Sequence, residues 1–175
     1  MNQLDYIHDL ATFTALWSRA RMGVQSLVSK SRDELLYFDP IDIATQKFFD
    51  LIQTLVAFTN TTDFATVILK PDPFNYFHHH FGKYPGFVHK KNNTDEEFFH
   101  FMMQDPGGSP ADALGVNHEH YVIMPTDGDW LAFGDRSWDV GVFYGPPEIM
   151  QCAREFYPFF VKPPSGFRVE PENPD

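Results

Sequence analysis

The chain lacks several features that would assign it to a class of protein at once. It holds a single cysteine, Cys152, so no disulfide can form within the chain. No apolar run approaches the roughly 20 residues that a membrane-spanning helix needs. The first residues do not show the basic segment and apolar run of a secretory signal. These absences predict a cytoplasmic protein with no membrane partner.

Positive charge is also scarce. The 175 residues include 13 Lys and Arg against 24 Asp and Glu, which gives a formal net charge of −11. This excess of negative charge repels a phosphate backbone, so we do not expect nucleic acid as a partner. The same charge would speed the encounter with a basic protein, although it also serves solubility.

Recognisable catalytic motifs are missing as well. The glycines at 107 and 108 form no P-loop, because no Gly-Lys-Ser/Thr follows them. Cys152 lies in an apolar helical stretch, which favours a packed residue over a nucleophile. Four Asp residues could supply paired carboxylates, but they lie in turns, where Asp is common for backbone reasons: Asp127, Asp129, Asp135 and Asp139. We therefore predict no cofactor and no catalytic residue.

Histidine is the residue type that offers a metal site. On a strand, His118 and His120 would point to the same face, and His78 or one of its two neighbours could add a third ligand. No ligand motif such as H-E-x-x-H is present, so surface or loop roles are the simpler interpretation and no metal is expected. A metal-dependent hydrolase that uses these histidines is the alternative function.

The composition, with 43% hydrophobic and 17% aromatic residues, provides ample core material for one domain. Spacing predicts helices over about 2–29, 39–59, 74–81, 95–104 and 146–156, strands over 64–69 and 121–124, and a turn over 84–87. We expect an α+β fold: a small, mostly antiparallel sheet of about four strands, with a C-terminal hairpin, packed against N-terminal helices. Residues 1–157 form this domain, and 158–175 form a Pro-rich tail that packs through its phenylalanines.

The stretch 128–144 gives the strongest local signal. Aromatic and β-branched runs flank Gly134-Asp135-Arg136-Ser137, which predicts a β-hairpin in which Gly134 takes the positive φ of the turn. The expected core residues of the hairpin are Trp130, Phe133, Val140 and Val142.

The hairpin tip offers two interpretations. Asp135, Arg136 and Trp138 could contact a partner, because Arg and Trp dominate the energetics of many interfaces. Alternatively, Arg136 pairs with Asp135 or Asp139, and the tryptophans fill the core. We predict Asp135, Arg136 and Trp138 as partner-binding residues.

The pattern Gly128-Asp129-Trp130, Gly134-Asp135-Arg136, Val140 and Val142 resembles the C-terminal hairpin of bacterial immunity proteins encoded beside polymorphic toxins, and of their uncharacterised relatives. The resemblance implies an acidic, cytoplasmic, non-enzymatic α+β protein that occludes the active site of a toxin domain. The leading hypothesis is therefore a binding protein for a basic partner. The alternatives are the metal-dependent hydrolase and a structural protein that acts through self-association.

Overall fold

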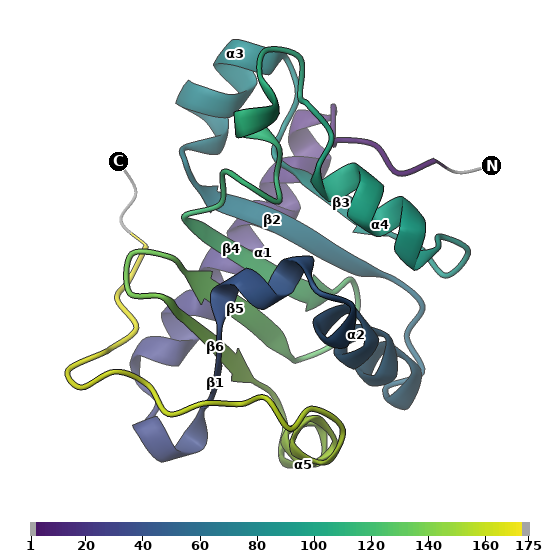
Figure 1. The fold of residues 1–175 in the computed structure, drawn as a ribbon. Helices are drawn as coiled ribbons and strands as arrows, with labels where there is room; N and C mark the ends of the chain where they lie inside the picture. Colours follow the sequence, from purple (N-terminus) through teal and green to yellow (C-terminus); the bar gives the residue numbers. More distant parts are fainter. Residues whose placement is uncertain (1–2, 173–175) are drawn as a thin grey trace.

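The computed structural model describes residues 3–172, which form a sheet covered by helices on both faces (Figure 1). The strands are β1 (Leu36–Phe38), β2 (Phe64–Lys70), β3 (Gly86–His89), β4 (His120–Pro125), β5 (Leu131–Asp135) and β6 (Val140–Tyr144). Their order is β1-β6-β5-β4-β2-β3, and every neighbouring pair is antiparallel. The predicted α+β class with an antiparallel sheet is confirmed.

The helices are α1 (Leu10–Val28), α2 (Gln46–Phe58), α3 (His79–Phe81), α4 (Asp95–Met102) and α5 (Pro147–Phe156). The predicted capping box at α4 is present: Glu97 N donates to Thr94 Oγ1 at 3.1 Å, and Thr94 N donates to the Glu97 carboxylate at 2.8 Å. Among the helices described, none combines the length and apolarity that a membrane span requires.

The sheet is buried on both faces, which gives the protein two cores. On one face, α2, α4 and α5 pack over residues such as Tyr121 and Ile123. On the other face, α1 packs over Val122 and Met124, and Figure 1 shows α1 behind the sheet with α2 and α5 in front. The side chains of alternate β4 residues therefore pack into opposite cores, as the two-residue period of a strand requires.

The C-terminal tail contributes to the α1 face. Phe167 and Val169 are buried in that core, and Val161 pairs with Tyr37 beyond the edge of the sheet. Phe159, in contrast, is 47% exposed, so only part of the predicted phenylalanine packing is realised. Residues 173–175 of the predicted tail lie outside the described residues. The tail thus packs beside β1, the strand at this edge of the sheet.

The predicted start of the first helix is wrong. Asn2 lies outside the described residues, and α1 begins only at Leu10, with the Asp9 carboxylate accepting from Thr12 N at 2.7 Å. The apolar residues before it match helical spacing, but Leu4 and Tyr6 are buried as an extended segment. Gly23 lies within α1, which continues to Val28.

Three further predictions about element boundaries need correction. The second helix does not start at Asp39: that residue caps a short 3-10 helix, Pro40–Ala44, and α2 begins at Gln46 behind the Thr45 cap. The stretch 84–87 is not only a turn, because Gly86 already pairs with Val67 in the edge strand β3. With β1 at the opposite edge, the sheet has six strands where about four were expected.

The hairpin of β5 and β6 is confirmed, but its turn lies elsewhere. Gly134 stays within β5, and a Cβ atom there would meet the Tyr121 ring at 2.2 Å, so this glycine makes room for that ring. The left-handed residue of the turn is Asp139, with a φ of 51°. The four predicted hairpin core residues are all buried: Trp130, Phe133, Val140 and Val142.

Candidate functional site

The hairpin turn is built on the Asp135 side chain. Its carboxylate accepts hydrogen bonds from Ser137 N at 2.9 Å, Ser137 Oγ at 2.5 Å and Trp138 N at 3.3 Å. Such an Asx arrangement fixes a turn without help from glycine. Asp135 is only 8% exposed, so its first role is to hold the turn that carries Trp138.

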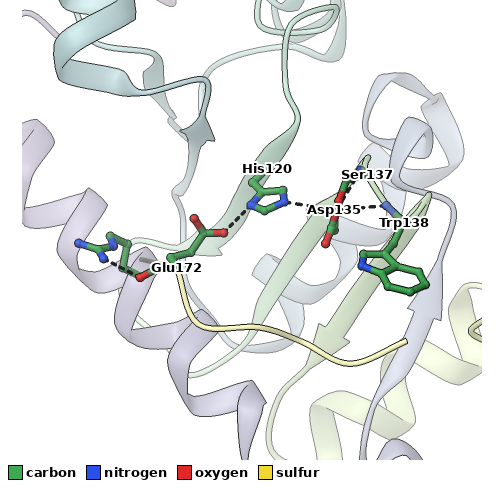
Figure 2. A network of polar contacts seen from close by, with 6 residues as sticks. His120, Asp135, Ser137, Trp138 and Glu172 are labelled. Atoms are coloured by element: carbon green, nitrogen blue, oxygen red, sulfur yellow. Dashed lines mark hydrogen bonds and ion pairs between the residues drawn. The ribbon is translucent and has the colours of Figure 1, made fainter. Parts of the chain in front are cut away.

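His120 links this turn to the C-terminal tail. Residues His120 and Asp135 face each other across β4 and β5, which brings His120 Nε2 to 3.3 Å from Asp135 Oδ1. The other ring nitrogen, Nδ1, lies 2.5 Å from Glu172 Oε1 (Figure 2). One imidazole thus lies between two carboxylates that come from different parts of the chain.

The two carboxylates control the protonation of His120. Burial acts to lower the pKa of His120, but the hydrogen bonds and charges of Asp135 and Glu172 outweigh it and raise the pKa to about 9. Burial likewise acts to raise the pKa of Asp135, and the hydrogen bonds from His120 and Ser137 outweigh it and lower the pKa. His120 is therefore an imidazolium ion at neutral pH, held in a charged cluster.

His118 has the opposite environment. Its Nδ1 donates to Leu114 O at 2.9 Å, and its Nε2 accepts from Arg136 Nη1 at 3.2 Å. Burial, followed by the charge of Arg136, lowers the pKa of His118 to about 4, so the ring is neutral at physiological pH. One interpretation of the sequence paired Arg136 with Asp135 or Asp139. In the structure, Arg136 instead donates to the neutral ring of His118.

The expectation that His118 and His120 share a strand face is wrong. β4 begins at His120, so His118 precedes the extended backbone to which the two-residue period applies. The His118 ring contacts Tyr121, which belongs to the core under α2, whereas the His120 ring contacts Phe133 in the core under α1. The two imidazoles therefore pack on opposite faces of the sheet.

The third histidine of the hypothetical metal site has another partner. The His78 ring stacks on Tyr84 with 4.4 Å between the ring centroids. Across residues 3–172, no three His, Cys, Asp or Glu side chains form a group with metal-binding geometry. Cys152 packs at the edge of the core under α2 and α5, where burial and then Glu155 raise the pKa of its thiol.

A small acidic cavity opens beside His120. It measures about 190 Å³, and its carboxyl groups are Glu119, Asp135, Glu170 and Glu172. Its cationic groups are Lys70 and the His120 imidazolium, and Trp138 lies at its rim with 44% of its surface exposed. Figure 2 shows Trp138 next to Asp135 on the turn. The cavity therefore combines excess negative charge with an accessible aromatic ring.

The structure brings two of the three predicted contact residues together. Asp135 and Trp138 line the acidic cavity, whereas Arg136 is half-buried against His118. Sequence reasoning missed Glu170 and Glu172, because no local signal places these tail residues at this site.

Comparisons with protein-family models, with curated proteins and with solved structures found no significant match to this chain.

Proposed function

We propose that this chain is a non-enzymatic binding protein for a basic protein, and that a Lys or Arg side chain of the partner enters the acidic cavity beside Trp138. The observation that carries the proposal is the cavity itself, in which four carboxyl groups lie next to an exposed tryptophan. Charged and aromatic groups that meet in a pocket are typical of binding hot spots.

The charges of the cavity favour a cation over an anion. His120 and Lys70 offset two of the four negative charges, which leaves an excess of about two, while Asp135 and Glu172 already bind His120. Glu119 and Glu170 are exposed, and neither side chain forms an ion pair with any residue among 3–172. These two carboxylates are therefore the groups in this proposal that meet the incoming cation.

Trp138 supplies the second contact. An indole face attracts Lys and Arg through its π electrons, and the attraction is worth about 0.5–1 kcal/mol at an exposed site. The ring is held in place because Trp138 N donates to Asp135 and the indole packs against Phe167, at 5.9 Å between centroids. A fixed ring loses little conformational freedom when a partner covers it.

The net charge of −11 would draw a basic partner toward this face from a distance. In the immunity-like version of the proposal, the partner is a toxin domain, and the protein neutralises it by covering its active site. We place this encounter in the cytoplasm, because a chain with one cysteine makes no internal disulfide and suits a reducing compartment.

The experiment starts from protein captured by the immobilised chain in extracts of its source cells at low salt. A captured basic protein is then titrated with the wild type, with Trp138→Ala and with Phe156→Ala, which removes a similarly exposed aromatic ring from α5. We expect about tenfold weaker binding for Trp138→Ala only, and weaker binding of all forms at high salt. Equal affinity of the two variants, or affinity that salt does not change, would contradict the proposal.

A further inference from the structure

A second cavity lies between the end of α1 and the tail, away from the acidic site. It measures about 480 Å³, within the size range of pockets that hold small organic ligands. One wall is formed by the end of α1 and the turn that follows it, and the other by the tail around Phe167. It shares no lining residue with the acidic cavity.

The charge of this cavity is opposite to that of the whole molecule. Its charged lining residues are Lys30, Arg32 and Arg168, and no Asp or Glu side chain lines it. Three of the 13 basic residues therefore converge on one hollow of a chain with a net charge of −11. The positive charges come from both walls, two from the turn after α1 and one from the tail.

The nearest carboxylates do not cancel this charge within the cavity. Glu34 closes a capping box, in which Ser31 N donates to its carboxylate at 2.7 Å, and it does not line the hollow. Asp33 is exposed on the same short helix and also lies outside the lining. Arg32 donates to Pro163 O at 3.4 Å and Pro164 O at 3.2 Å, which fixes its positive charge beside the tail.

Apart from Ser31, the side chains that make up the rest of the lining are apolar. Leu27 and Leu35 come from the α1 side, Tyr37 from β1, and Phe167 and Val169 from the tail. The Tyr37 and Phe167 rings meet edge to face, with 6.2 Å between centroids. Leu35, Tyr37 and Phe167 are 7%, 5% and 2% exposed, so the cavity reaches only the edges of these side chains, and a compact apolar group would cover those edges.

We propose that this cavity binds a small organic anion, in which an aromatic or other compact apolar group carries one phosphate or carboxylate head. The apolar group packs on Leu35, Tyr37 and Phe167, and the anionic head lies among Lys30, Arg32 and Arg168. The ligand contacts both the segment that follows α1 and the tail, so its binding also stabilises the packing of the tail on the sheet.

The test is a calorimetric titration of the full chain with 1-naphthyl phosphate. The comparison probes are 1-naphthol, which lacks the charge, and inorganic phosphate, which lacks the apolar group. We expect saturable binding of 1-naphthyl phosphate that is at least tenfold tighter than that of either comparison probe. Absence of saturable binding, or equal affinity for 1-naphthyl phosphate and one of its two parts, would overturn the proposal.

Two double variants locate the site. Lys30→Gln with Arg168→Gln removes two charges from the cavity, and Lys90→Gln with Lys91→Gln removes two exposed charges elsewhere. We expect the first pair to weaken binding about tenfold and the second pair to change it little. Equal losses in both pairs would show only general attraction and would contradict the assignment.

The binding site can also be mapped on the wild-type protein, and this measurement does not depend on whether a variant folds. Backbone amide resonances followed by NMR should shift with 1-naphthyl phosphate in residues 27–37 and 166–169, the two walls of the cavity. Shifts confined to other parts of the chain would overturn the site. Because the acidic cavity shares no lining residue, failure of this test leaves the proposed partner binding unaffected, and the reverse also holds.

Discussion

His120 Nδ1 lies 2.5 Å from Glu172 Oε1, although 52 positions separate the two residues in the chain. The opposite nitrogen of the same ring lies 3.3 Å from Asp135 Oδ1. A single imidazolium ion therefore ties the C-terminal tail to the hairpin turn that presents Trp138. The shape of the acidic cavity depends on this contact, because all three side chains of the cluster line it.

The cluster makes stability depend on pH. The pKa of His120 is raised to about 9 in the folded protein, against roughly 6.5 in an unfolded chain. Its stabilising contribution is fully present below about pH 6.5 and is lost as pH rises through about 9. We expect the free energy of unfolding, measured with denaturant, to fall by about 2 kcal/mol between pH 6.5 and 9. In His120→Gln this part of the pH dependence should be absent, and an unchanged slope would contradict the account.

Glu172→Gln tests how far the tail carboxylate raises the pKa of His120. Removal of this carboxylate takes away one charge and changes one hydrogen bond of the imidazolium, so the pKa of His120 should fall well below about 9. The pKa is read from an NMR titration of the ring protons. Glu170→Gln is the control, because Glu170 lines the same cavity without bonding to His120. A pKa that stays at about 9 in Glu172→Gln would show that the tail does not hold the ring.

Gly134→Ala tests the packing under the hairpin. The added methyl group would lie 2.2 Å from the Tyr121 ring, which is buried and whose hydroxyl donates to Pro40 O at 2.7 Å. The ring has little room to move, so we expect a loss of about 3 kcal/mol in thermal or chemical unfolding. Gly82→Ala, at a position with open space and a φ of 69°, should cost only about 1 kcal/mol. Equal losses would indicate that the Tyr121 ring moves aside for the added methyl group, which would contradict this account of the packing.

Phe167→Ala tests whether the tail belongs to the folded core. Phe167 is 2% exposed and packs beside Val169 on the α1 face of the sheet. Truncation of a buried phenylalanine costs about 3–5 kcal/mol. Phe156→Ala, at a 45% exposed position, should cost less than about 1 kcal/mol. If denaturant midpoints of the two variants coincide, the tail adds little to stability.

The sequence predicts those parts of the fold that local chemistry determines. The hairpin arms, the buried strand β2 and the α4 capping box follow from strand-forming runs or from a cap that residues within a few positions complete. The start of α1 was misjudged because Leu4 and Ile7 repeat at a helical interval, yet Leu4 and Tyr6 are buried from an extended segment. Burial of two side chains outweighs spacing there.

The sequence predicts only some of the residues that form the candidate site. Asp135 and Trp138 stand out beside the hairpin turn, but Arg136 faces the opposite core because His118 offers it a neutral acceptor. Glu170 and Glu172 reach the site through long-range packing of the tail, for which periodicity and motifs give no signal. The edge strand β3 was missed for the same reason, since a short edge strand depends on the neighbour that pairs with it.

The most direct test of the central claim compares two pairs of charge changes in the titration of the captured basic partner. Glu119→Gln with Glu170→Gln removes the two exposed carboxylates of the acidic cavity, and Glu148→Gln with Glu155→Gln removes two exposed carboxylates of α5. Both pairs change the net charge equally. The account predicts about tenfold weaker binding for the cavity pair and less than about threefold for the α5 pair. Equal dissociation constants for the two pairs would contradict it.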